Sequence, residues 1–411
     1  MEIVKDIQQL KLLIITAQTP YGKKEAFILE EILHLKEIGI QIHIIPRNPP
    51  SIRFHRSTNE IASSVIRLPL INISMIIAFL YTLLINRKLQ IITSRVIFSS
   101  SNLITALKNF IILPKSVFIL KYVSILNINH IHVHWGTTTA TMAYVISYLT
   151  DIPWSLTLHR HDIGANNLLK HKCESARFIR CTSQDAFAEL QQKVGREYDS
   201  KIKIIYTGVV IPDTAQYRKA KNNFNIIVCP AFFENKKGHK YLIDACKILI
   251  SDGYKKFRCF LIGEGHEKNF LIRYINKLSL KKFIKLVETL QHEDLINLYA
   301  SGLVSLVALP SIIENSGERE GIPVSLIEAM AYHIPVVSTN TGGIPELLKN
   351  NAGILVNQKD PECLASAMKL LWTDFEHIKK IAFNGYETVS KNFNINQTSK
   401  SLLLSIINNH Y

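Results

Sequence analysis

Short apolar runs alternate with amphipathic stretches along two separate parts of the chain. In the first part, the apolar runs predict strands at residues 10–16, 40–46, 130–134, 154–158, 178–182 and 201–206. The alternation begins again after residue 223, with strands expected at residues 224–230, 257–263, 283–288, 303–310 and 335–339. Amphipathic stretches between them predict helices at residues 25–37, 138–149, 267–277, 293–300 and 324–332, and after residues 183 and 238. Strands that alternate with helices are typical of parallel α/β domains.

Two domains are expected from this pattern and from the length of the chain. One apolar core rarely serves more than about 250–300 residues, and this chain has 411. The polar segment 213–223 separates the two alternating parts. We therefore predict one α/β domain at residues 1–212, a second at residues 213–391, and a C-terminal helix within residues 392–411.

The region 61–150 differs in composition from the rest of the chain. It is rich in Ile, Leu and Phe, it carries seven Lys and Arg residues, and it contains no Asp or Glu. The whole chain has a formal net charge of +15. Basic and apolar residues without acids favour an anionic membrane surface as partner. We expect no nucleic-acid partner, because no RNA- or DNA-binding motif accompanies the charge.

Within this region, residues 68–85 carry no charge over 18 positions, which is just long enough to span a bilayer. The stretch contains Pro69 and Asn72 and has basic residues on both sides, so we favour a buried or surface-lying helix. The first residues of the chain, MEIVKDIQQLKLLIITAQ, lack the layout of a secretory signal peptide. We therefore expect a cytoplasmic protein that lies peripherally at the inner face of the cytoplasmic membrane.

The segment 314–348, ENSGEREGIPVSLIEAMAYHIPVVSTNTGGIPELL, holds the most informative chemistry. Pro323 precedes a predicted helix, and the amides of Val324 and Ser325 point out of its N-terminus, where phosphate binds well. Glu320 stands just before the helix and Glu328 about one turn inside it. A rise of 1.5 Å per residue places the two carboxylates about 10 Å apart, near the span from a hexose to a ribose across a diphosphate. A surface helix with acids near its N-terminus is the alternative.

The stretch EGIPVSLIEAMA, followed by PVVSTNTGGIPELL, resembles the donor-binding signature of retaining glycosyltransferases, in particular glycosyltransferase family 4 and its members in colanic-acid, O-antigen and capsule assembly. The resemblance covers nearly the whole chain. It implies the GT-B fold, an α/β fold in which an N-terminal acceptor domain and a C-terminal donor domain, both Rossmann-like, face each other across a cleft. It also implies that the C-terminal helix packs back on the N-terminal domain.

The family's motif assigns roles to individual residues. Its first Glu approaches the donor sugar and its second Glu binds the ribose, and these positions are Glu320 and Glu328. PAFFENKKGHKYLIDA resembles the segment in which a Lys before Gly grips the diphosphate, here Lys237, and TPYGKKEAFILEEI resembles the first loop, where Gly22 lies near the phosphates. The donor-binding residues implied are Glu328, Gly22, Gly321, Ile322, Val324, Ser325, Gly342 and Gly343.

One position departs from the family pattern. The family usually has an Arg five residues before the diphosphate-binding Lys, and this chain has Phe232 there. A basic phosphate ligand is therefore absent. We expect Lys237 to share the diphosphate with Lys236 or with helix amides.

Histidines dominate the expected site of the N-terminal domain. His130, His132 and His134 alternate along one predicted strand and share one of its faces. Histidines at such spacing can bind a metal. No carboxylate stands near them in the sequence, so we expect no metal site. HIHVHWG with SLTLHRHDI resembles the family segments that hold His134 and Asp162 on the acceptor side and His159 near the donor hexose. Each histidine could instead be a hydrogen-bonded structural residue.

The resemblance implies a hexosyltransferase that moves a sugar from a nucleotide-sugar, UDP-sugar favoured, to a lipid-linked or surface polysaccharide with retention of configuration. Glu320, His159 and Lys237 are the catalytic residues implied, and no cofactor or metal is needed. Two alternatives stay open, a nucleotide-sugar-binding protein of other activity, such as an epimerase, and a degenerate binding module. The sequence does not identify the sugar, the base, the acceptor or the oligomeric state.

Overall fold

The computed structural model describes residues 9–23, 25–50, 52, 54–213 and 224–408. Most of the expected linker, residues 214–223, lies outside the described residues. The chain divides into two compact units. Unit 1 comprises the chain up to Tyr206 together with the C-terminal segment from Thr398, and unit 2 comprises Thr207–Gln397. The boundaries expected from the sequence fell after residues 212 and 391.

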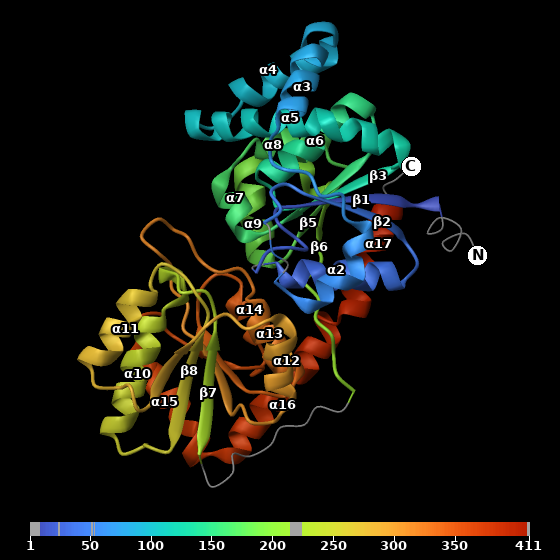
Figure 1. Ribbon diagram of the computed structural model, residues 1–411. Helices are drawn as coiled ribbons and strands as arrows, with labels where there is room; N and C mark the ends of the chain where they lie inside the picture. Colours follow the sequence, from blue (N-terminus) through green and yellow to red (C-terminus); the bar gives the residue numbers. More distant parts are fainter. Residues whose placement is uncertain (1–8, 24, 51, 53, 214–223, 409–411) are drawn as a thin grey trace. The chain divides into compact units, whose positions relative to one another are not determined.

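Unit 1 is built around one parallel sheet of six strands in the order β2-β1-β3-β4-β5-β6 (Figure 1). The strands are β1 (Lys11–Thr16), β2 (Gln41–Pro46), β3 (His130–His134), β4 (Trp154–Leu158), β5 (Phe178–Cys181) and β6 (Ile202–Ile204). The six strand predictions for this part of the chain are confirmed. Strands β3, β4 and β5 are buried at every position, as expected for a parallel sheet covered on both faces.

The helices of unit 1 connect these strands. They are α2 (Ala26–Glu37), α3 (Ile73–Ile85), α4 (Arg87–Phe98), α5 (Leu103–Ile125), α6 (Thr138–Thr150), α7 (Arg160–Ala165), α8 (Leu169–Ser175), α9 (Gln184–Val194) and α17 (Ile395–Asn408), with 3₁₀ segments η1 (Arg56–Ser64) and η2 (Arg196–Lys201). The apolar middle region forms α3, α4 and α5, as expected. The short helices α7 and α8 are not predicted, because one or two turns carry no readable apolar period.

Alternating side chains of β1 enter two different apolar cores, as the two-residue period of a strand requires. Leu13 and Ile15 join the core that contains α3 to α6 and α9. Leu12 and Ile14 join the core formed with α2 and α17. The C-terminal helix contributes four buried residues to this second core, Leu402, Leu403, Ile406 and Ile407.

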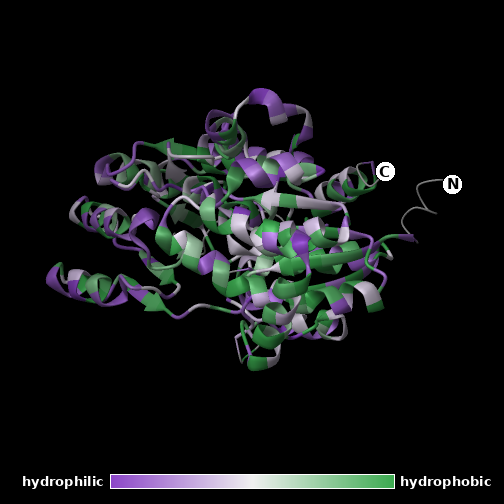
Figure 2. Cartoon of the chain, turned by 90° about the horizontal axis from the view of Figure 1, so that it is seen from above, coloured by the Kyte–Doolittle hydropathy of each residue, from purple (hydrophilic) through white to green (hydrophobic). Residues whose placement is uncertain are grey.

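Unit 2 repeats the plan with the strand order β12-β11-β10-β7-β8-β9. Its strands are β7 (Asn225–Pro230), β8 (Phe257–Ile262), β9 (Ile284–Val287), β10 (Leu306–Leu309), β11 (Val336–Thr339) and β12 (Ile354–Val356). Its helices are η4 (Asn235–Lys237), α10 (His239–Ser251), α11 (Lys268–Lys277), α12 (His292–Ala300), α13 (Val324–Ala331), α14 (Ile344–Leu348), α15 (Pro361–Thr373) and α16 (Phe375–Asn392). The sequence analysis predicts all of these except β12, α14, α15, α16 and η4. Many helices carry both hydrophobic and hydrophilic residues, as helices with one buried face do (Figure 2).

One described helix is long and apolar enough to cross a membrane by length and composition alone, and it is α5, not the stretch 68–85 considered above. Its most apolar 18-residue window is 44% buried inside the structure. Helices α3 and α4 pass the same test only as a pair, and they are bent by 109° at the break between them. The uncharged stretch 68–85 contains α3, whose 13 residues are fewer than the about 20 that a spanning helix needs.

Candidate functional site

Two loops at the carboxyl edge of the unit 2 sheet bring Lys237 and Glu320 together. Strands β7 and β10 are neighbours in the sheet. The loop after β7 contains Lys237, and the segment between β10 and α13 contains Glu320. The ammonium Nζ of Lys237 lies 2.9 Å from Oε2 of Glu320. Sites of open parallel sheets form at this edge, so two residues expected to bind a donor meet at the expected place.

One carboxylate oxygen of Glu320 is left over from this ion pair. Its Oε1 is buried and has no hydrogen-bond partner among the described residues. A buried carboxylate oxygen without a partner is costly and calls for a specific explanation. The N-terminus of α13 follows directly, and proline has no side-chain acceptor, so Pro323 leaves the amides of Val324 and Ser325 without a side-chain cap. The segment thus offers an acceptor oxygen beside outward-pointing amide donors.

Gly342 and Gly343 let the turn between β11 and α14 pack against the Glu320 segment. Gly342 has a φ of +52°, and a Cβ there would lie 1.9 Å from the carbonyl oxygen of Glu320. A Cβ on Gly343 would lie 2.8 Å from Cγ1 of Ile322 and 3.0 Å from the carbonyl carbon of Gly321. Within the described residues, the two glycines therefore let their turn lie against the backbone of residues 320–322. They help in this way to position Glu320.

Glu328 has a partner that the sequence analysis missed. Its Oε1 lies 2.7 Å from Nε2 of His292, the first residue of α12. Both side chains are mostly buried, with exposed fractions of 9% and 13%. Because His292 holds Oε1 of Glu328, the position of the second carboxylate oxygen, Oε2, is also fixed. The position of His292 just after β9, at the carboxyl edge of a sheet strand, is the signal that could have pointed to it.

The loop that contains Phe232 holds both lysines that were expected to bind the diphosphate, Lys236 and Lys237. Nζ of Lys236 lies 2.7 Å from Glu318 and 3.6 Å from Glu234. Burial alone would lower the pKa of Lys236, but the neighbouring carboxylates of Glu318, Glu320 and Glu234 together outweigh burial and raise this pKa. Lys236 is therefore held by two carboxylates, while Lys237 faces Glu320.

The first loop of unit 1, with Gly22, is folded around the carboxylate of Glu25. Its Oε2 accepts hydrogen bonds from the amide of Gln18 at 2.9 Å and from the hydroxyl of Thr19 at 2.7 Å. Its Oε1 accepts from the indole N–H of Trp135. A Cβ on Gly22 would lie 2.6 Å from Oε1 of Gln18, so the glycine serves the tight loop itself.

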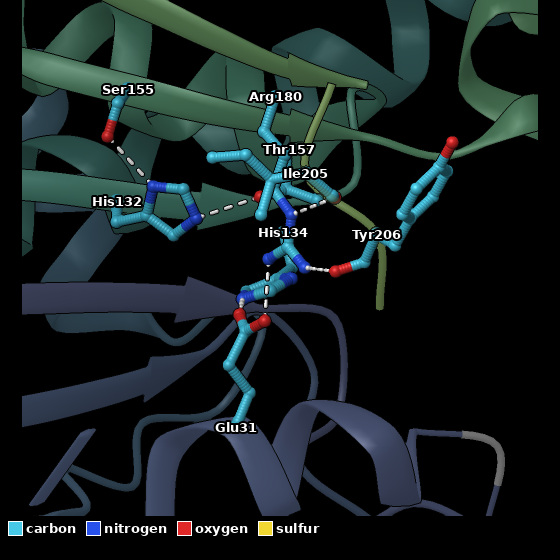
Figure 3. A network of polar contacts seen from close by, with 8 residues as sticks. All are labelled: Glu31, His132, His134, Ser155, Thr157, Arg180, Ile205 and Tyr206. Atoms are coloured by element: carbon cyan, nitrogen blue, oxygen red, sulfur yellow. Dashed lines mark hydrogen bonds and ion pairs between the residues drawn. The ribbon is translucent and has the colours of Figure 1, made fainter. Parts of the chain in front are cut away.

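A polar network crosses the face of the unit 1 sheet that packs on α2 (Figure 3). Nε2 of His134 lies 3.3 Å from Oε1 of Glu31, whose Oε2 accepts a hydrogen bond from Nη1 of Arg180 at 2.6 Å. His132 is hydrogen-bonded through Nδ1 to Ser155 at 2.8 Å and through Nε2 to Thr157 at 2.9 Å. Glu31 comes from α2, far away in the sequence, so the premise that no carboxylate stands near the histidines is corrected.

The electrostatics of this network follow from burial and from the charge of Arg180. Burial alone would raise the pKa of Glu31, but the Arg180 guanidinium and His134 overcome burial and hold this pKa well below its ordinary value. Burial, together with His134, lowers the pKa of His132 well below its ordinary value. Among the described residues, no group of three or more His, Cys, Asp or Glu side chains could hold a metal ion.

His159 and Asp162 lie at the carboxyl end of β4. Oδ2 of Asp162 accepts a hydrogen bond from the amide of His159 at 2.9 Å, and burial raises the pKa of Asp162 to about 6. The His159 ring packs on Trp135 at a centroid distance of 4.4 Å and is stacked with His134 at 6.3 Å. Burial, with the neighbouring His134, lowers the pKa of His159 to about 3, so its imidazole is neutral at pH 7.

His159 keeps one group for a ligand. Its Nε2 is buried and has no hydrogen-bond partner among the described residues. In His134, Glu31 holds Nε2, but the buried Nδ1 likewise has no hydrogen-bond partner among the described residues. Each of the two histidines expected at the site therefore keeps one ring nitrogen for a further partner, and His134 is also built into the polar network.

Comparison with known proteins supports the family resemblance. A model of the family "Glycosyl transferases group 1" matches residues 212–388. The putative colanic acid biosynthesis glycosyltransferase WcaL of Salmonella typhimurium is 34% identical over 185 residues, which are 44% of this chain and 45% of the relative. The amylovoran biosynthesis glycosyltransferase AmsK of Erwinia amylovora is 36% identical over 34% of each chain. The matches thus span less than half the length of these curated relatives.

The fold likeness extends over nearly the whole chain. The crystal structure of HepE from Anabaena in complex with UDP superposes with a TM-score of 0.70 at 16% identity, and the match covers 97% of this chain and 99% of that one. Together with the two parallel sheets, this likeness confirms a two-domain Rossmann-like α/β fold of the GT-B type.

Proposed function

We propose that the protein is a glycosyltransferase of polysaccharide biosynthesis, because a model of the family "Glycosyl transferases group 1" matches residues 212–388 and the chain has the GT-B fold. It moves a hexose-type sugar from a nucleotide-sugar to a lipid-linked or surface polysaccharide acceptor. The donor lies against unit 2, and the acceptor is assigned to unit 1.

The observation that carries this proposal is the arrangement around Glu320. Lys237 compensates one of its carboxylate oxygens, while the buried Oε1 has no hydrogen-bond partner among the described residues. A sugar hydroxyl would satisfy that oxygen. The diphosphate would take Lys237 and the amides of Val324 and Ser325, which together supply one positive charge and two donors.

A ribose fits the second carboxylate. Glu328 is held by His292 at 2.7 Å, so its orientation is set before a ligand arrives. A fixed carboxylate on the buried side of α13 can accept from ribose hydroxyls. UDP is the favoured nucleotide, because the structurally similar HepE was crystallised in complex with UDP.

The chemistry follows from charge stabilisation. We infer a front-face displacement, in which the bond between the sugar anomeric carbon and the phosphate oxygen breaks and the electron pair stays on the phosphate. The acceptor oxygen bonds to the same face of the carbon, and its proton passes to the departing diphosphate, so configuration is retained. Lys237 and the helix amides stabilise the diphosphate, while Glu320 and the neutral His159 stabilise the oxocarbenium-like sugar. The step is proposed to need no metal, because Lys237 and the helix amides offset part of the negative charge of the leaving group.

The acceptor side is assigned to unit 1. Asp162 fixes the backbone at His159, and His134 shapes the same edge of the sheet. The basic, acid-free region 61–150 supports an acceptor at the inner face of the cytoplasmic membrane.

Nucleotide binding tests the proposal directly. Thermal shift of the purified chain against UDP-, GDP- and ADP-sugars is expected to show stabilisation with one donor. Replacing Glu328 by Ala should weaken that donor by about 1–3 kcal/mol, the size of a hydrogen bond to a charged group. Glu376→Ala, an exposed Glu on α16, is the matched control and should leave binding unchanged. Equal affinity in E328A and wild type would remove the ribose assignment.

Phe232 favours one competing function. The chain lacks a basic residue there, and Lys236 is held by Glu318 and Glu234, which suits a degenerate module that binds nucleotide without transfer. Donor binding with neither transfer nor slow donor hydrolysis would support that module. Release of free sugar or transfer to an acceptor would exclude it.

A further inference from the structure

Helix α3 presents an apolar stripe to solvent. Residues 73, 76, 77, 80, 81, 84 and 85 lie on one face at helical spacing, and all seven are large and apolar or aromatic. Their exposed fractions range from 38% at Ile76 to 80% at Leu84. The opposite side of the same helix is buried through Met75 and Phe79. A helix that is apolar on its core face and also on its outer face is not explained by the fold of a protein surrounded by water.

The first half of α5 continues this pattern. Leu103, Ile104 and Leu107 are exposed by 86%, 67% and 58%, followed by Phe110 at 44%. The helices α3 and α5 pack on each other, and Phe79 meets Phe110 edge to face with ring centroids 6.2 Å apart. Figure 1 shows α3, α4 and α5 grouped at one end of unit 1. The exposed stripe of α3 and the first half of α5 are called the docking face below.

Most of the charges around the docking face are positive. Arg87 and Lys88 follow α3 directly, Lys108 lies within the apolar stretch of α5, and all three are exposed. No Asp or Glu occurs between residues 61 and 150. Asp151, just outside this range, lies 2.9 Å from Lys88, so Arg87 and Lys108 carry the net positive charge. Exposed apolar side chains with a basic border complement a surface that is apolar inside and anionic outside, which is a bilayer with anionic lipids.

We propose that the docking face seats unit 1 on an anionic lipid bilayer, with the α3 stripe immersed at the level of the headgroups and upper acyl chains. The immersion is interfacial rather than spanning, because α3 has 13 residues and turns by 109° into α4. A second copy of the chain would also cover apolar residues, but like-charged borders repel in a symmetric pair.

Buried polar anchors connect the docking face to the acceptor edge of the sheet. Lys115 of α5 is fully buried, and its Nζ donates to the carbonyls of Pro46, at the end of β2, and of Arg47 at 2.7 and 2.8 Å. Asn109 of the same helix accepts from the hydroxyl of Thr141, in the first turn of α6, at 3.0 Å. The bilayer is thus held at a fixed place relative to the edge that bears His159. This step rests on the proposed function, because it is useful only to an enzyme with a membrane-borne acceptor.

Vesicle flotation of the full chain tests the docking face. The probes are vesicles of phosphatidylcholine alone and of phosphatidylcholine with phosphatidylglycerol. Wild type should float with the anionic vesicles and much less with the neutral ones. The double variant Ile77→Ser, Leu84→Ser should bind about a hundredfold more weakly, about tenfold for each large apolar side chain kept out of the lipid. Arg87→Glu with Lys108→Glu should lose at least about fivefold for each base removed.

Leu303→Ser with Phe383→Ser is the matched control, because both residues lie in unit 2 with exposed fractions of 57% and 55%. It should float like wild type. The substituted side chains are exposed, so the variants should fold, and an unchanged thermal shift with the donor nucleotide in the absence of vesicles verifies this. That measurement also separates the two proposals, since a missing nucleotide shift counts against the transferase and leaves the flotation result standing.

Three results would overturn the docking face. The first is undiminished flotation of I77S/L84S. The second is equal flotation of wild type on neutral and anionic vesicles with resistance to alkaline extraction, which would indicate a spanning helix. The third is a wild-type dimer that fails to float and that I77S/L84S converts to a monomer, which would assign the face to a second copy of the chain.

Discussion

Unit 1 and unit 2 each hold a mostly buried acid–base pair, and the two pairs are built differently. In unit 2, Glu320 and Lys237 are exposed by 10% and 16%, and Oε1 of Glu320 has no hydrogen-bond partner among the described residues. In unit 1, Glu31 and Arg180 are exposed by 6% and 1%, and Arg180 is bonded on three sides. The first pair can exchange its partner for a ligand, whereas the second is closed.

The closed pair determines where the chain leaves unit 1. Nε of Arg180 donates to the carbonyl of Ile205 at 2.8 Å, and Nη2 donates to the carbonyl of Tyr206 at 2.7 Å (Figure 3). Tyr206 is the last residue of this part of unit 1. A buried ion pair therefore points to ligand binding in unit 2 and to chain geometry in unit 1.

The largest expected effect comes from opening the closed pair. Arg180→Met should lower the free energy of unfolding by about 3–5 kcal/mol, because Glu31 is left as a buried charge without its cation. Urea unfolding followed by circular dichroism measures this. Lys237→Met, in the open pair, should lower the free energy of unfolding by less, because the Lys237 side chain is 16% exposed against 1% for Arg180, and Arg180 makes three hydrogen bonds.

Equal losses in R180M and K237M would break the comparison. They would mean that the Lys237–Glu320 pair is also a structural element. In that case the unpartnered oxygen of Glu320 would no longer point to a ligand.

A second expected effect concerns the open pair and catalysis. Glu320→Gln should lower turnover about 10²–10³-fold, the range seen when one group that stabilises developing charge is removed. Affinity for the nucleoside diphosphate should be kept or increased, because Lys237 loses the carboxylate that competes with the diphosphate. Turnover assays and calorimetric titration with UDP separate the two. A parallel loss of both would assign Glu320 to ground-state binding.

The same contrast explains what the sequence could predict. The residues around Glu320 and Glu328 lie in one segment, where a proline and a helix N-terminus make the local geometry readable. The expected strands of both units were found because parallel strands are continuous apolar runs. Lys237 comes from a different loop, so only the family motif, and not its spacing from Glu320 and Glu328, could place it at the same site.

The network of unit 1 could not be predicted in this way. Glu31 sits in a helix that looks like any amphipathic helix, and Arg180 lies inside an apolar strand. Their contact spans 149 positions of sequence, and no local pattern reports it. His292 was missed for a similar reason, because its partner Glu328 lies 36 positions further along the chain. The two-residue alternation of the sequence predicted that the histidines of β3 share one face. It could not predict the partners of these histidines, which decide their role.

The smallest expected effect is a pH dependence that sharpens the difference between the pairs. Arg180 and His134 hold the pKa of Glu31 well below its ordinary value of 4.5, against the effect of burial. A depressed pKa contributes stability that is fully present above the ordinary value and is lost as the pH falls below it. The stability lead of wild type over Glu31→Gln should therefore be largest near pH 7. Below about pH 4.5 it should shrink by at most about 1.4 kcal/mol per pH unit, the slope of one proton.

Urea unfolding of wild type and E31Q at pH 7, 5 and 4 measures this slope. Glu376→Gln, with its side chain exposed on α16, is the matched control and should follow wild type at each pH. A lead of wild type over E31Q that does not change with pH would mean that the shape and hydrogen bonds of Glu31, which Gln largely reproduces, matter more than its charge. The closed pair would then differ from the open pair in packing alone, and the unpartnered oxygen of Glu320 would be the one electrostatic feature that separates a ligand site from a structural one.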